Sequence, residues 1–304
     1  MTHSFASCAL TYAYIPSTRF VEVSSGEKTY IFQPNHQCKW VRWLCILVTV
    51  STSVRAGEEN ANDGWNLLSR YLYRDAAEVF QQSSTEDLRL RDLGLAASML
   101  NEPPITTGKI ARAEALLRKV MAAGLNDDTG LYASYLVASI LQRHRTATNG
   151  EIEAAYRAVI QINPTSAIAQ ISAAHLALVL LYQRADLPIA ARLQAAGELE
   201  KIATGPHLPE VALGYYQHLA DAAMYYDVLD DRVVEWLEKA HAIGSSDELT
   251  QSTLSLQIAE TARKTGQREK AIGYYQQFLA DAVPTEQRYH TAEVRMGELM
   301  KESR

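Results

Sequence analysis

The chain has 304 residues, of which 47% are hydrophobic, so it is long enough to bury a substantial core in one or two domains. Its formal net charge of −6 argues against binding to nucleic acid or to an anionic membrane surface, because Lys and Arg side chains supply most of that binding. The three cysteines, Cys8, Cys38 and Cys45, all lie near the amino end. The rest of the sequence therefore has no thiol for a nucleophile, a disulfide or a cysteine-ligated metal site.

Residues 1–56 are predicted to be an amino-terminal extension that ends in a secretory signal. Lys39 and Arg42 precede a short apolar run, and small residues follow as far as Ala56. This charged, apolar and cleavable order is typical of a signal peptide, and the run is too short to span a bilayer. We predict a signal core at about residues 39–56, cleavage after Ala56, and a periplasmic or secreted protein with no stable membrane insertion after cleavage. The alternative is a cytoplasmic protein in which this segment is a buried helix.

From Asn62 onward, apolar residues recur with the period of amphipathic helices, and almost no strand-like alternation occurs. Gly, Pro and Asn separate the helical blocks, and we expect neighbouring blocks to pair as short antiparallel helices. The predicted breaks are residues 101–104, 145–150, 162–164, 185–188, 204–209, 244–248 and 283–286. One inward-facing stripe is predicted to contain Ile110, Ala113, Leu117, Val120 and Met121.

One spacing recurs in three of these blocks: a small or aliphatic residue, an aromatic residue four positions later, and a further core position after three more. The full sets are Tyr73, Ala76, Phe80 and Ser83; Ile152, Tyr156, Val159 and Pro164; and Gly266, Ala271, Tyr275 and Phe278. This pattern resembles the second helix of the tetratricopeptide repeat, in which a small residue allows two helices to approach. Weaker copies place Ala115, Ala190 and Val233 at the first position, and residues 236–240 have some Sel1-like character.

The resemblance to tetratricopeptide repeats implies that residues 57–304 form an all-α domain, a right-handed α-solenoid of about six antiparallel helix pairs. Residues 285–302 are expected to be a C-terminal capping helix that begins with Thr285 as its cap. The side chains expected to pack inward from this helix are Tyr289, Val294, Met296 and Leu299.

No constellation of residues in the sequence indicates catalysis, cofactor binding or metal binding. Phosphate-binding loops, nucleophile elbows and paired zinc-binding histidines are all missing from the sequence. Adjacent tyrosines on a helix point about 100° apart, so one member of each Tyr doublet is expected to fill the core. We predict that Tyr216, Tyr226 and Tyr275 are those members.

The tetratricopeptide resemblance further implies that the first helix of each pair lines a concave groove that captures a partner protein or peptide. By position, the groove residues are predicted to be His175, Tyr182, His218, Tyr225, Glu260 and Arg263. This interpretation makes the protein a non-enzymatic scaffold of the cell envelope. The alternative is an enzyme, or an enzyme subunit, that acts on envelope polysaccharide, and Glu260 is the acidic residue we would test first.

Overall fold

The computed structural model describes residues 59–83, 88–202, 208–245, 247–284 and 287–301, and all regular secondary structure within them is helical. The prediction of an all-α fold is therefore confirmed for this part of the chain. The predicted signal, its cleavage site, the three cysteines and the Thr285 cap lie outside the described residues. Among the helices that are described, none combines the length and the apolarity needed to cross a bilayer.

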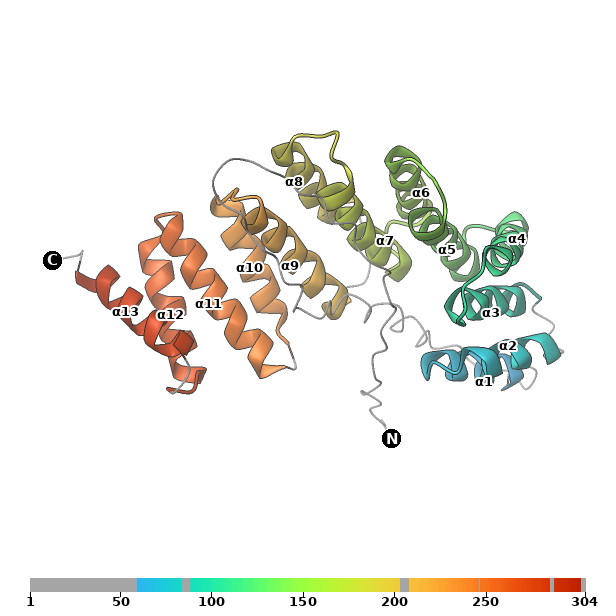
Figure 1. Cartoon of the computed structure of the whole chain (residues 1–304), viewed down its shortest axis with the longest axis horizontal. Coiled ribbons are helices and arrows are strands. Elements are labelled where there is room, and N and C mark those ends of the chain that lie inside the picture. The colour runs from blue at the N-terminus through green and yellow to red at the C-terminus, as the bar shows by residue number, and fades with distance from the viewer. Residues whose placement is uncertain (1–58, 84–87, 203–207, 246, 285–286, 302–304) are drawn as a thin grey trace. The chain divides into compact units, whose positions relative to one another are not determined.

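The chain divides into two compact units between Val120 and Met121. The helices of the first unit are α1 (Glu59–Ser69), α2 (Tyr73–Gln82), α3 (Leu88–Asn101) and most of α4 (Thr107–Ala123) (Figure 1). Helices α1, α2 and α3 all contact one another.

The Phe80 ring is completely buried in the first unit and lies against Gly64 and Gly94. A Cβ atom on Gly94 would come within 2.3 Å of the ring, so glycine is required for this close approach. Trp65 meets the same ring edge to face, with 5.3 Å between the ring centroids. Phe80, the aromatic residue of the first recurring set, therefore connects its own helix α2 with both α1 and α3.

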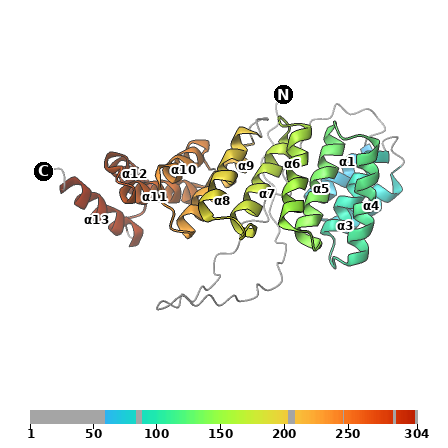
Figure 2. The ribbon, with the colours of Figure 1, turned by 90° about the horizontal axis from the view of Figure 1, so that it is seen from above.

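The second unit contains nine α-helices and two short helical segments among its described residues. They are α5 (Asp128–His144), α6 (Asn149–Ile162), α7 (Ala167–Leu178), η2 (Val179–Gln183), α8 (Ile189–Gly197), η3 (Glu198–Lys201), α9 (Pro209–Tyr225), α10 (Asp231–Ile243), α11 (Glu248–Lys264), α12 (Arg268–Asp281) and α13 (Gln287–Lys301). Consecutive helices pack against each other, and α7 also contacts both α5 and α9. Figure 2 shows α5, α6 and α7 side by side.

Three members of each recurring set are buried, whereas Tyr73 is half-buried and Gly266 and Pro164 are exposed. The exposed fraction is 0% for Ala76, Phe80, Tyr156, Ala271, Tyr275 and Phe278, and it does not exceed 6% for Ile152, Val159 and Ser83. The same stripe continues on α10, where Val233, Leu237 and Ala240 are buried. The predicted stripe on α4 is also correct for Ile110, Ala113, Leu117 and Val120, whereas Met121 is half-buried.

Two of the weaker copies were assigned wrongly. Ala115 and Ala190 are exposed, and the buried positions nearby are Ala113 and Leu193. Ala115 is two residues from both Ala113 and Leu117, and two residues along a helix turn a side chain to nearly the opposite side. A fixed interval between repeats is therefore a poor guide here, because the units differ in length.

The same turn ends a helix at three places, although their sequences differ. In each, a residue with positive φ is followed by an N–H group that donates to the carbonyl five residues earlier, which caps the helix. The residues with positive φ are Tyr71 (66°), Asp227 (56°) and Gly266 (77°). The capping hydrogen bonds are Leu72 to Leu67 (2.9 Å), Val228 to Ala223 (2.9 Å) and Gln267 to Ala262 (2.8 Å).

Helix α13 packs on α12 through residues that differ in part from the expected ones. Leu299 is buried as predicted, but Val294 is 45% exposed and Ala292 is completely buried instead. The Arg268 guanidinium donates hydrogen bonds to the Leu299 carbonyl and so ties the end of α13 to the start of α12. A small side chain at position 292 lets α13 approach its neighbour closely, which a hydrophobicity pattern does not reveal.

The Tyr doublets give one correction. Tyr275 is completely buried as predicted, but Tyr215 rather than Tyr216 fills the core, with 7% exposure and a 2.5 Å hydrogen bond from its hydroxyl to the Ala196 carbonyl. Tyr216 is half-buried and donates to Glu200 at 2.8 Å. Both rings of a doublet can reach covered surroundings when helices pack on two sides, so helical geometry alone could not choose between them.

Candidate binding surface

All six residues predicted for the groove lie on α7 with its extension η2, on α9 or on α11. Glu260 and Arg263 form an ion pair at 3.3 Å. The charge of His218 lowers the pKa of His175, and that of Tyr225 raises the pKa of Tyr182, so the six residues are considered as three pairs. The three pairs differ in exposure and in hydrogen bonding, and these differences decide what each can do.

Tyr182 owes its position to the π-helical segment η2, which extends α7 by one wide turn. Val179, Leu180 and Leu181 are buried in this turn, whereas Tyr182 is 41% exposed. The turn closes with a hydrogen bond of 3.2 Å from the Arg184 N–H to the Val179 carbonyl. A π-helical turn changes the direction of the following side chains, and such turns occur frequently at functional sites.

Tyr225, at the end of α9, is the most exposed of the large hydrophobic side chains in the described part of the chain, at 70%. Its ring meets that of Tyr226 edge to face, with 5.0 Å between centroids. The Tyr226 hydroxyl donates to the Leu181 carbonyl at 3.3 Å, and this hydrogen bond places the tyrosines of α9 beside η2. Tyr182 and Tyr225 therefore belong to one aromatic surface.

Asp221 is a member of this surface that the sequence prediction missed. It precedes Tyr225 by one helical turn, so the two side chains share a face of α9. Asp221 is exposed to solvent at its surface, yet the protein packed around it raises its pKa to about 6. Burial, and negative charge on Asp221, Tyr226 and Tyr225, raise the pKa of Tyr182 to about 12. The i, i+4 spacing of Asp221 and Tyr225 was the sequence signal from which Asp221 could have been assigned to this surface.

His175 lies in an aromatic cluster, where its ring stacks on Tyr156 with 5.9 Å between centroids. Its Nε2 atom is 3.1 Å from the Tyr135 hydroxyl. Burial lowers the pKa of His175 to about 3, and the positive charges of Arg143 and His218 act in the same direction. Burial also lowers the pKa of His218 to about 4. Both imidazoles are therefore neutral at pH 7 and add no charge to the surface.

Glu260 is held by a network of hydrogen bonds that joins α11, α12 and α13. Its carboxylate accepts hydrogen bonds from the Tyr275 hydroxyl at 2.5 Å, from Arg295 and from Arg263 at 3.3 Å. Burial alone would raise the pKa of Glu260, but these donors and the charge of Arg295 hold it below its usual value. A carboxylate stabilised in this way is a poor proton donor at neutral pH, and general acid catalysis requires a proton donor.

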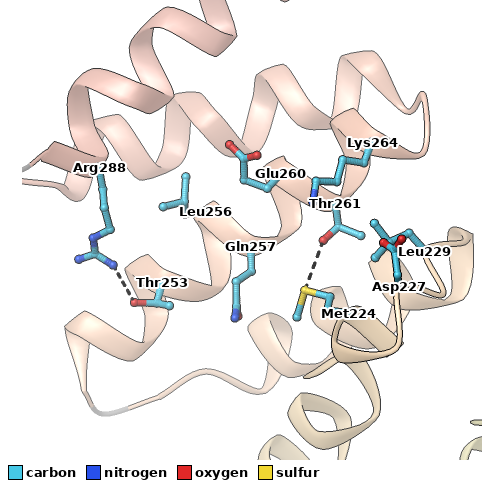
Figure 3. Close-up of a pocket in the computed structure, with 10 residues that line it drawn as sticks. All are labelled: Met224, Asp227, Leu229, Thr253, Leu256, Gln257, Glu260, Thr261, Lys264 and Arg288. Carbon is cyan, nitrogen blue, oxygen red and sulfur yellow. Dashed lines mark hydrogen bonds between the residues drawn. The ribbon is translucent and has the colours of Figure 1, made fainter. Parts of the chain in front are cut away.

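Glu260 also lines a hollow of about 310 Å³ beside α11. Its walls come from the end of α9 and the turn after it, from α11 and from α13, as Figure 3 shows. The lining mixes apolar, uncharged polar and charged side chains: Met224, Asp227, Leu229, Thr253, Leu256, Gln257, Glu260, Thr261, Lys264 and Arg288. At one side of the hollow, Arg288 donates a hydrogen bond to Thr253 at 3.3 Å.

Within the residues that the structure describes, no group of three or more His, Cys, Asp or Glu side chains could hold a metal ion. The aromatic surface instead offers contact area with polar tips, which is what tyrosine supplies at protein interfaces. No protein-family model matches the chain, and no curated protein matches its sequence.

Proposed function

We propose that residues 57–304 form a non-enzymatic scaffold of tetratricopeptide-like repeats, with some Sel1-like character, that captures a partner protein or peptide. In this proposal the helix pairs stack into a right-handed solenoid of about six pairs with α13 as its cap. The burial of three members of each recurring set and the repeated capping turn support it, since both are expected when similar helix pairs are stacked.

The observation that carries the proposed function is the exposure of Tyr182 and Tyr225, at 41% and 70%, on neighbouring helical segments. Exposed apolar side chains that lie together on a surface mark interaction sites, and tyrosine is enriched at the energetic centres of interfaces. We also propose that the protein is exported to the cell envelope, on the basis of the signal-like residues 39–56.

The test compares the protein with its double variant Tyr182→Ala, Tyr225→Ala in affinity capture from an envelope fraction. We expect one stoichiometric partner with the unchanged protein and at least about a tenfold loss with the variant, because aromatic anchors carry much of an interface's binding energy. The melting temperature should change little, since both side chains are exposed.

The matched control is Leu249→Ala, Val294→Ala, which removes two apolar side chains that are 58% and 45% exposed elsewhere in the second unit. Capture should be unaffected by this change. Unchanged capture by the tyrosine variant would contradict the proposal. Turnover of a cell-wall glycan, abolished by Glu260→Gln, would instead favour the enzymatic alternative.

A further inference from the structure

Helix α13 is attached to the second unit by little buried apolar surface. Of its fifteen residues, Ala292 and Leu299 are the buried ones, whereas α11, with seventeen residues, buries six. Tyr289 and Met296, which were expected to pack inward, are half-buried. Helices in proteins are held mainly by the packing of an apolar face on their neighbours, so α13 gains less from burial than α11 does.

Two arginines of α13 connect it with α11. Arg295 forms an ion pair with Glu260, and Arg288 donates a hydrogen bond to Thr253 at 3.3 Å. The same Glu260 carboxylate accepts a hydrogen bond of 2.5 Å from the Tyr275 hydroxyl of α12. The carboxylate of Glu260 is therefore the point at which α11, α12 and α13 meet through polar groups.

Arginine contacts also supplement the small apolar contact between α13 and α12. Arg268 on α12 donates a hydrogen bond of 2.8 Å to the Leu299 carbonyl, in the last turn of α13. The Arg288 guanidinium carbon lies 6.0 Å from the centre of the Phe278 ring, which is completely buried. Arg288 is thus part of the cover over the aromatic face of α12.

The hollow beside α11 depends on the same contacts. Glu260 and Arg288 both line it, and Arg288 is the lining residue that α13 contributes (Figure 3). If α13 moves away, the hollow loses the wall that Arg288 provides, and Glu260 loses its ion pair with Arg295. The position of α13 therefore sets how open the hollow is.

We propose that α13 is a latch, which detaches from the second unit as one element while α11 and α12 stay folded, and that its detachment opens the hollow. Local opening of this kind is expected where an element has few buried apolar contacts and is held by partly exposed polar ones. This device is separate from the aromatic surface and does not depend on partner capture at Tyr182 and Tyr225.

The first test measures amide hydrogen exchange of the full chain by mass spectrometry at pH 7. We expect the amides of α13 to exchange at least about tenfold faster than those of α11 and α12, after correction for intrinsic rates, because α13 opens without them. Equal protection of the three helices would show that they unfold as one cooperative unit and would overturn the inference.

The second test weakens the latch with Arg295→Gln. Exchange of α13 should become at least about fivefold faster, because a hydrogen bond to a charged group is lost, and protection of α11 and α12 should stay within about twofold. The matched control Lys301→Gln removes the same charge from an exposed position of α13 and should change the exchange of α13 by less than about twofold. Unchanged exchange of α13 in Arg295→Gln, or loss of protection in all three helices, contradicts the latch.

The opening of the hollow is measured by thiol labelling with N-ethylmaleimide. Leu256, which lines the hollow, is replaced in Leu256→Cys, and modification of position 256 is followed by peptide mapping, which separates it from Cys8, Cys38 and Cys45. Adding Arg295→Gln should raise the labelling rate at position 256 at least about threefold. Leu249→Cys, at an exposed position of the same helix, should be labelled at the same rate with and without Arg295→Gln. An unchanged rate at position 256 would refute the coupling between the latch and the hollow.

Discussion

At the scale of single residues, most covered carboxylates of the described chain are neutralised by a nearby cation. Glu153 is paired with Arg157 and Arg184, and Lys119 reaches across from α4 to Asp92. Such pairs remove the cost of placing a charge near apolar surroundings, although exposed ones add little net stability. Asp221 is exposed and has no such pair within the described residues, and the protein around it raises its pKa.

The Asp221→Asn variant is therefore expected to be more stable than the unchanged protein at pH 7.5. The folded-state pKa of about 6 lies above the ordinary value of 3.8, so the folded protein pays for ionisation as the pH rises through this window. We expect a gain in the free energy of unfolding of less than about 1 kcal/mol, because solvent screens an exposed carboxylate.

Urea denaturation at pH 7.5 and at pH 4 measures this effect. The gain should shrink toward zero at pH 4, where the folded protein carries a protonated Asp221. Glu210→Gln, which removes an exposed carboxylate from the same helix, serves as the control. A variant less stable than the unchanged protein at pH 7.5 would mean that Asp221 has a stabilising partner.

At the scale of helices, close approach between elements is set by small residues as much as by large ones. Gly94 on α3 and Gly64 on α1 make room for the Phe80 ring, and Ala292 lets α13 lie against α12. Gly273, in contrast, is in the middle of α12 with nothing within 4 Å of where its Cβ would be. Replacing glycine with alanine is therefore expected to have opposite effects on stability at Gly94 and at Gly273.

We expect Gly94→Ala to lower the free energy of unfolding by about 1–3 kcal/mol, since the added methyl group overlaps the Phe80 ring and the packed side chain cannot move away freely. Gly273→Ala should raise it by roughly 0.5–1 kcal/mol, because alanine favours the helix and meets no neighbour. Chemical denaturation of both single variants gives the comparison. If both substitutions stabilised the protein, the close packing of Phe80 on Gly94 would be disproved.

At the scale of the whole molecule, the chain consists of two compact units whose boundary falls within α4. The second unit, residues 121–304, contains the aromatic surface, the hollow and the Glu260 network. Each of its helices contacts the next along the chain, so its core is continuous and uses local contacts. Such a unit has what it needs to fold without the preceding residues.

A fragment consisting of residues 121–304 is therefore expected to be helical and to unfold in a cooperative thermal transition. Circular dichroism at a helix-sensitive wavelength measures both properties. A helical fragment that melts without a cooperative transition would show that the first unit is needed to complete the core.

The sequence by itself determined the all-helical class, the positions of most breaks between helices, and the core residues of three helices. These features depend on local periodicity: a stripe of apolar residues every three or four positions can be buried only as a helix face, and Gly or Pro ends it. For this reason Ala76, Tyr156 and Tyr275 were identified correctly. Tyr182 and Tyr225 were predicted for one groove by their positions in the tetratricopeptide-like pattern and not by periodicity.

Only the tertiary structure decided which side chains near that surface are buried by neighbouring helices and which form hydrogen bonds or ion pairs. The π-helical turn that exposes Tyr182 has no sequence signature, and Tyr215 and Tyr216 could be separated only by the helices packed on either side of them. The partnerless carboxylate of Asp221 depends on what other segments bring, or fail to bring, within a few ångströms of it. Periodicity predicts the direction in which a side chain points from its own helix. The burial, ion pairing and pKa of that side chain depend on neighbours that are distant in the sequence.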